Sequence, residues 1–334
     1  MSPDNDKLYT AKEQSHAACR GLMGRCLRFC SPALRATMAT MTKCSPAVLA
    51  LLVLTACEQK DTPPEPRTPE EMYAHVQYLL KPHVEGEQSD FAGAMQWLRK
   101  AAESGHLQAQ TDLGGIYLQG GKGVAPNPQE AFRWFSKAAE QGSNEARVYL
   151  GSMLSTGQGC TKDVPQAKEH LRQAAAANLP EAQYRLAMLM LQENAPADYP
   201  ESLDLLARAA AGKSLHTAAL AARALGNIYA KGNAGVQADM HTAANWYKQA
   251  ARGGDARSQL VYAIMLLDGQ WVPKDEQQGM AMLRLAAGQD YPQAIALLIN
   301  LLRNAPNAAD YEAEAAAWAS RLDSLRSSPR QPAS

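Results

Sequence analysis

The middle of the chain carries a pattern of apolar and small residues that recurs every 36 to 39 residues. Each unit begins with an alanine, and a leucine follows four residues later, with a glycine directly after the leucine in three of the four clearest units. These units begin at Ala109, Ala146, Ala182 and Ala221. Self-similarity at such a period indicates a solenoid, in which each unit is one supersecondary element stacked on the next.

A second motif follows in the same units and predicts a second helix. It places an alanine, then a tryptophan, a pair of alanines and a final glycine, and it matches at 94–105, 131–142 and 243–254. Apolar residues three and four positions apart line one helical face, and small residues there allow two antiparallel helices to approach closely. We expect the large Trp and Tyr side chains to fill the gaps and the glycines to end the helices in the left-handed conformation. The fold class predicted for residues 70–323 is therefore all-α, a solenoid of tandem antiparallel two-helix repeats with less regular caps.

The order of alanine, Leu-Gly, tyrosine, Gly-rich loop, alanine, tryptophan, Ala-Ala and glycine is similar to the Sel-one-like repeat family, a relative of the tetratricopeptide repeat. The resemblance covers roughly residues 90 to 290 and is fullest at 109–142 and 221–254. The unit that begins at Ala182 departs from it, with Ala187 in place of the glycine. The resemblance implies a non-enzymatic scaffold that binds proteins, with bacterial members in exopolysaccharide secretion or signalling.

Ahead of the repeats, residues 46–56 form a short apolar run that is preceded by Lys43. This is the layout of a secretory signal peptide. The run is too short for a transmembrane helix, which needs about 20 apolar residues. A buried core helix is the alternative, but the next stretch is polar, rich in proline and unsuited to packing. We therefore expect a signal peptide over 41–56 and a flexible linker over 57–69.

The sequence Leu-Thr-Ala-Cys that ends at Cys57 resembles the lipobox of bacterial lipoproteins. This resemblance implies that Cys57 becomes the first mature residue and carries the lipid. Several acyl chains together give stable membrane anchoring. Glu58, which follows, implies the periplasmic face of the outer membrane rather than the inner membrane.

Residues 1–40 do not fit a signal peptide, because they are polar, carry scattered arginines and make the leader too long. We expect translation to start at Met38 or Met41, and a genuine basic extension is the alternative. At the other end, we expect residues 324–334 to form a disordered tail.

Charge and cysteine content exclude two classes of protein. The chain has 33 basic and 33 acidic residues, and the part after the signal is mildly acidic, with no basic stripe on any predicted helix. Nucleic acid is thus excluded as a partner, since phosphate binding depends on clustered Lys and Arg. Of the six cysteines, Cys160 alone lies after Cys57, so no disulfide framework supports the repeats.

The sequence predicts no catalytic, metal or cofactor site. The glycines at 120, 121 and 123 lack the phosphate-loop spacing, because Ile116 stands where the first glycine would be. The histidines do not fall in a metal-ligand spacing. The alternative function is a hydrolase of the β-lactamase-like type seen in some cysteine-rich relatives, but their paired cysteines and a Ser-x-x-Lys motif are both absent from the repeats.

In tetratricopeptide-type solenoids, the first helix of each repeat lines a binding groove through positions that flank the Leu-Gly pair. Carried over to this chain, those positions and the next turn predict an apolar partner-binding groove. It comprises Val148, Tyr184, Met188, Leu191, Leu260, Ile264 and Leu267. Such a surface commonly marks a site for a protein partner, here expected in the cell envelope. The alternative is that these residues pack against neighbouring helices in irregular repeats.

Overall fold

The computed structural model describes residues 66–81, 90–121 and 123–327, and these residues form fourteen α-helices, a short 3-10 helix and no strand. The predicted all-α solenoid is confirmed. The helices are α4 (Pro69–Leu80), α5 (Phe91–Glu103), α6 (Leu107–Gln119), α7 (Pro128–Glu140), α8 (Asn144–Thr156), α9 (Val164–Ala176), α10 (Pro180–Glu193), α11 (Tyr199–Ala210), α12 (Leu215–Lys231), α13 (Met240–Arg252), α14 (Ala256–Asp268), α15 (Glu276–Gly288), α16 (Pro292–Arg303) and α17 (Ala308–Ser327), with the 3-10 helix η1 (Pro196–Asp198) before α11.

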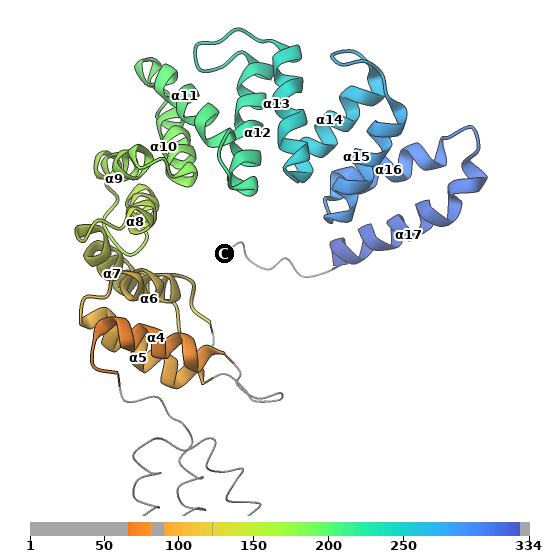
Figure 1. The fold of residues 1–334 in the computed structure, drawn as a ribbon. Coiled ribbons are helices and arrows are strands. Elements are labelled where there is room, and N and C mark those ends of the chain that lie inside the picture. The colour runs from red at the N-terminus through yellow and green to blue at the C-terminus, as the bar shows by residue number, and fades with distance from the viewer. Residues whose placement is uncertain (1–65, 82–89, 122, 328–334) are drawn as a thin grey trace, which may run out of the picture. The chain divides into compact units, whose positions relative to one another are not determined.

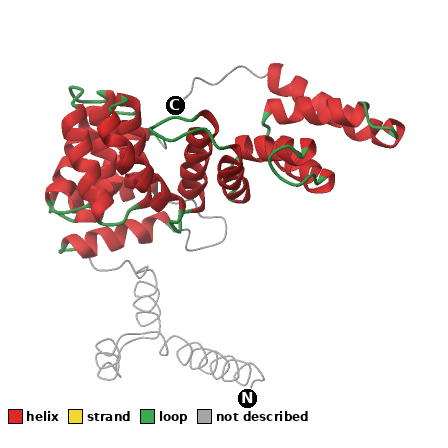
Figure 2. Cartoon of the chain, turned by 90° about the horizontal axis from the view of Figure 1, so that it is seen from above, coloured by secondary structure: helices red, strands yellow, loops and turns green. Residues whose placement is uncertain are grey.

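The helices pack as seven successive pairs, from α4 with α5 to α16 with α17, and each pair also packs against the next. Figure 1 shows the pairs following one another in chain order, and Figure 2 shows that loops join the helices. The first helix α10 additionally contacts the first helices of both neighbouring pairs, α8 and α12. Side chains on α10 therefore lie where three repeats meet.

Side-chain caps fix where most helices begin. Asp163, Asp239 and Asp275 precede the second helices α9, α13 and α15, and each carboxylate accepts a hydrogen bond from a backbone N–H of the first turn. These bonds satisfy amides that have no partner inside the helix. Beyond the second helices, Gly142 and Gly254 have φ values of 95° and 91°, which confirms the predicted left-handed ends.

The two helices of a pair approach most closely at the Leu-Gly glycine. A Cβ added to Gly114 would lie 2.8 Å from the ring of Phe135, and one added to Gly226 would lie 2.8 Å from the ring of Tyr247. At these two glycines the covering ring is not that of a tryptophan but that of the next residue, which is Phe135 in one repeat and a tyrosine, Tyr247, in the other. Trp134 faces the adjoining core instead.

The described part extends slightly past the expected repeat region. The capping box of Thr68 and Glu71 starts α4, and α17 continues to Ser327, beyond the expected boundary at 323. The leader 1–40, the signal peptide 41–56, Cys57, most of the linker and residues 328–334 lie outside the described residues. Within the described ranges, no helix is both long and apolar enough to cross a membrane.

Candidate protein-binding surface

The seven residues of the predicted groove lie on three first helices. Val148 is on α8, while Tyr184, Met188 and Leu191 are on α10, and Leu260, Ile264 and Leu267 are on α14. The structure brings the three residues of α10 together at one pocket. The α14 residues do not line this pocket.

One of the seven residues is buried. Val148 is 6% exposed and belongs to the core shared with α9 and α10, so its assignment to an accessible groove is corrected. Leu260 is partly buried against the core of the last pairs, and Leu267 is partly buried against α15, where a Cβ added to Gly279 would come within 2.9 Å of its side chain. The packing alternative therefore describes Val148.

Two of the seven are large apolar side chains that stay exposed. Met188 and Ile264 are each 39% exposed, and both occupy the same position of the repeat, directly after the two residues that stand in place of Leu-Gly. Ile264 stands apart from the pocket, whereas Met188 is part of it. The candidate site is therefore centred on α10.

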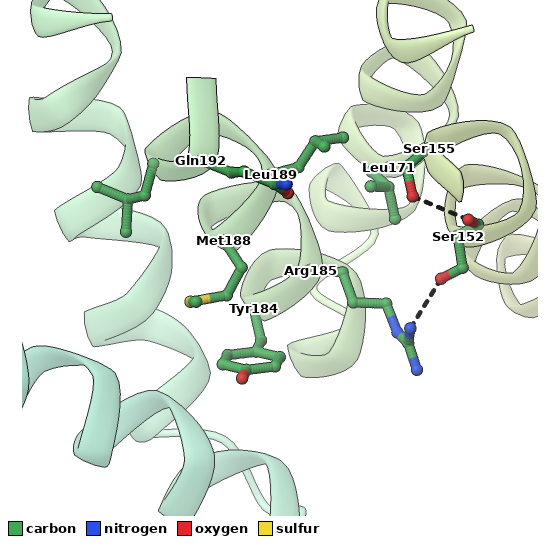
Figure 3. A pocket seen from close by; sticks show the side chains of 9 residues that line it. Ser152, Ser155, Leu171, Tyr184, Arg185, Met188, Leu189 and Gln192 are labelled. Carbon is green, nitrogen blue, oxygen red and sulfur yellow. Dashed lines mark hydrogen bonds between the residues drawn. The ribbon is translucent and has the colours of Figure 1, made fainter. Parts of the chain in front are cut away.

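The pocket measures about 520 Å³ and is open to solvent. Residues from α8, α9 and α10 line it, and most of their side chains are drawn in Figure 3. They are Ser152, Ser155, Leu171, Tyr184, Arg185, Met188, Leu189, Leu191 and Gln192.

Helix α10 can line a pocket because it is apolar on two faces. Ala182, Leu186 and Met190 form its buried face and are at most 1% exposed. Tyr184 and Leu191 lie on another side and are only partly buried. An ordinary surface helix has one apolar stripe and a polar remainder. The second apolar face of α10 is thus available for contacts outside its own pair.

Arg185 is held in place at the pocket by two hydrogen bonds. Its Nε donates to Oε1 of Glu181 at 2.7 Å. Its Nη1 donates to Oγ of Ser152 on α8 at 2.7 Å, as Figure 3 shows. The other oxygen of Glu181 accepts from Oγ1 of Thr217 on α12 at 2.9 Å. Arg185 is the one charged side chain among the nine that line the pocket. The guanidinium is therefore oriented before any partner arrives.

Tyr149, on α8 close to Ser152, adds a neutral polar surface. Its ring stacks on Phe135 with a centroid distance of 4.5 Å. Burial, followed by the negative charge of Glu145, raises the pKa of Tyr149. The phenol is therefore uncharged at neutral pH.

The sequence interpretation missed Arg185 as a candidate because it searched for apolar positions beside the Leu-Gly pair. The available signal was its spacing. Arg185 lies four residues after Glu181 and four before Leu189, so all three share one stripe of α10. No sequence feature indicated that Ser152 of the preceding repeat would contact the guanidinium.

The described residues contain no cluster of three or more His, Cys, Asp or Glu residues able to hold a metal ion. The glycine-rich loop after α6 is closed by paired backbone hydrogen bonds between Gly121 and Val124, 2.9 and 3.0 Å long. Cys160 is partly buried, and this burial raises the pKa of its thiol.

Comparison with known families identifies the repeats. The sequence model of the Sel1 repeat matches six consecutive segments, at residues 83–106, 107–143, 144–179, 180–214, 219–255 and 256–298. No curated protein is similar enough to count as a match.

Two solved structures resemble the chain. A Sel1 repeat protein from Oxalobacter formigenes is 25% identical with a TM-score of 0.62, and the similarity covers 77% of this chain and 98% of that one. A protective antigen present in uropathogenic Escherichia coli strains, which displays an SLR fold, is also 25% identical, with a TM-score of 0.64. The similarity to the antigen covers 83% of this chain and 56% of the antigen.

Proposed function

Because the chain belongs to the Sel1 repeat family, we propose that it is a protein-binding scaffold, without enzymatic activity, that is tethered to the bacterial cell envelope. The Sel1 repeat fold itself points to an interaction scaffold. The observation that carries the proposal is the open pocket on α10, where Tyr184, Met188 and Leu191 remain accessible beside an oriented arginine. Concave, largely apolar sites with a few fixed polar groups are typical binding sites.

The binding surface is tested by replacing Tyr184 and Met188 together with alanine. Both side chains are partly exposed, so we expect the variant to keep its helical content and melting temperature but to lose crosslinks to its envelope partners in intact cells. Leu285→Ala is the matched control, because Leu285 is 54% exposed on α15 and does not line the pocket. Loss of folding in the double variant would show that these residues are core, and unchanged crosslinking would place binding elsewhere.

The location we propose is the periplasmic face of the outer membrane, with a lipid on Cys57. The support is the Leu-Thr-Ala-Cys sequence after an apolar run, together with the proline-rich stretch that separates it from α4. The partners are then envelope proteins, in processes such as exopolysaccharide secretion or envelope signalling.

The anchor has its own experiment. Mass spectrometry of the mature amino terminus is expected to find a lipid-modified Cys57, and Cys57→Ser is expected to abolish palmitate labelling. An unprocessed Met1 would contradict the lipoprotein proposal. If an exported but untethered form complements a deletion strain fully, anchoring is not part of the function.

A further inference from the structure

We propose that the pocket on α10 recognises an internal segment of a partner protein that presents one aliphatic side chain and, beside it, the carboxylate of an Asp or Glu side chain. This inference rests on the proposed binding function and specifies the chemistry of the partner. Three observations carry it: the apolar side chains of the lining, the hydrogen-bond donors that Arg185 still has available, and the openness of the pocket.

The apolar lining selects an aliphatic group. Leu171, Met188, Leu189 and Leu191 supply aliphatic surface from two helices, and Tyr184 adds one aromatic ring. Met188 is exposed in the absence of a partner, and flexible thioether side chains adapt to differently shaped apolar ligands. A leucine, isoleucine or methionine of the partner would remove this surface from water.

Arg185 selects a carboxylate. Its two hydrogen bonds use Nε and one N–H of Nη1, and no described residue bonds to Nη2. Glu181 is itself held between Arg185 and Thr217, since one of its oxygens accepts from Nε of Arg185 and the other accepts from Oγ1 of Thr217. The N–H groups of Nη2 remain as donors, and charged N–H donors of a guanidinium suit a carboxylate.

The charges at the pocket also bear on the partner. Arg185 is the one charged side chain in the lining and forms an ion pair with Glu181 outside it, so a carboxylate of the partner can share the guanidinium through its Nη2 donors, whereas a Lys or Arg would find no carboxylate in the lining. An uncharged apolar segment would fill the apolar part and leave the donors of Arg185 to water alone. An acidic residue next to the aliphatic one satisfies both parts of the pocket.

Because the pocket is open, it suits an internal segment of the partner better than the partner's carboxyl terminus. Its lining runs along the solvent-facing side of α10 and reaches α8, and the pocket is not enclosed. The partner's polypeptide can therefore continue out of the pocket on both sides of the bound residues. We accordingly assign the carboxylate to a side chain and not to a carboxyl terminus.

The test begins with selection of random short peptides, displayed on phage, against the purified full-length protein. Peptides that emerge are synthesised with acetylated and amidated ends, and their Kd values are measured by fluorescence polarisation. We expect them to share an aliphatic residue close to an Asp or Glu. Arg185→Gln should weaken binding roughly tenfold or more, as should replacing the acidic residue of the peptide by its amide, since each change removes a charged hydrogen bond.

The two changes should not add, because they remove the same interaction. Arg185→Glu should instead favour a peptide in which the acidic residue is replaced by Lys. Arg133→Gln is the matched control, as Arg133 is an exposed arginine paired within its own helix to Glu130. Melting temperatures of all variants should stay close to that of the parent protein, because the side chain of Arg185 is 43% exposed and its ion pair with Glu181 lies at the surface.

The outcomes separate this inference from the proposed function. If Met188→Asp abolishes peptide binding but Arg185→Gln and the amide peptide change nothing, the pocket binds protein segments and the inference of an acidic partner is overturned. Enrichment of Lys or Arg in the selected peptides would overturn it as well. Leu285→Asp is the control for a new charge on the surface. If Met188→Asp and Arg185→Gln both bind the selected peptides as tightly as Leu285→Asp does, the pocket is not a binding surface. The proposed binding surface and the inference of an acidic partner then both fail.

Discussion

Gly114 and Gly115 are neighbours on α6 that differ in what surrounds them. A Cβ on Gly114 would meet the buried ring of Phe135 at 2.8 Å, whereas one on Gly115 would have no atom within 4 Å. We expect Gly114→Ala to destabilise the protein by about 1–3 kcal/mol through overpacking. Gly115→Ala should stabilise it by about 0.5–1 kcal/mol, because alanine restricts the unfolded chain and favours helix. Chemical denaturation of both variants checks this, and equal effects would contradict the close approach.

The buried face of His170 on α9 predicts a pH effect on stability. Its Nδ1 is buried and has no hydrogen-bond partner among the described residues. Burial, and secondarily the charge of Arg147, lowers the pKa of His170 below its ordinary value near 6.5. The unfolded state then binds a proton more readily than the folded state, so this contribution is present above about pH 6.5 and is lost as the pH falls towards the folded pKa. In His170→Gln, the free energy of unfolding should therefore depend less on pH below 6.5, and an unchanged pH profile would contradict the argument.

At the residue scale, the sequence predicted which glycines permit close approach but not which ring covers them. Trp134 and Phe135 are adjacent, and about 100° of helix rotation separates their side chains. Either aromatic side chain satisfies the apolar pattern. Only the rotation of α7 about its own axis, which depends on packing against α6, decides that Phe135 covers Gly114.

Buried glutamines connect one helix pair to the next. Nε2 of Gln110 donates to the carbonyl of Ala102 at the end of α5, and Nε2 of Gln259 donates to the carbonyl of Ala251 at the end of α13. Each of these carbonyls also accepts a backbone hydrogen bond of 3.1 Å, from Gly105 and Gly254 respectively, so the glutamine adds a second bond that joins the following helix to the end of the preceding one. Gln259 in turn accepts a hydrogen bond from Gln289 at 2.8 Å, which adds a link to the end of α15.

This arrangement predicts that Gln259→Met costs about 0.5–1.5 kcal/mol, since the carbonyl of Ala251 keeps only its backbone hydrogen bond from Gly254 and the amide of Gln289 loses its acceptor. Methionine keeps the length of the side chain and its packing volume. Gln293→Met is the control, because Gln293 is exposed on α16. The free energy of unfolding of this variant should lie within about 0.5 kcal/mol of that of the parent protein. Urea denaturation measures both, and a neutral Gln259→Met would show that the hydrogen bonds are dispensable.

At the scale of elements, the sequence placed three of its seven groove residues on α10, the helix that contributes most of the pocket lining. The apolar stripe through Tyr184, Met188 and Leu191 could be predicted from spacing alone. The burial of Val148 could not, because the spacing of apolar residues indicates which of them share a helix face but not how closely the neighbouring helix lies. The bond from Arg185 to Ser152 joins residues 33 positions apart and depends on how the repeats stack.

The molecule as a whole has a divided core. Buried apolar residues form several clusters, each of which draws on adjacent pairs, such as the cluster of α8 to α13 that contains Leu206 and the cluster of α14 to α17 that contains Leu298. In such an array, stability is approximately a sum of repeat terms and nearest-neighbour interface terms. A defect should therefore have consequences that depend on its position along the stack.

Leu206 and Leu298 allow this to be tested with one substitution at two places, because both side chains are fully buried. Replacement by alanine should cost about 2–5 kcal/mol at either position. Since α16 and α17 have a neighbouring pair on one side only among the described helices, Leu298→Ala should speed amide exchange there and leave α6 to α9 unchanged. Leu206→Ala, on α11, should speed exchange on both sides, from α8 to α13. Hydrogen exchange followed by mass spectrometry distinguishes these patterns, and a uniform increase over all helices in both variants would mean that the stack unfolds as a single cooperative unit.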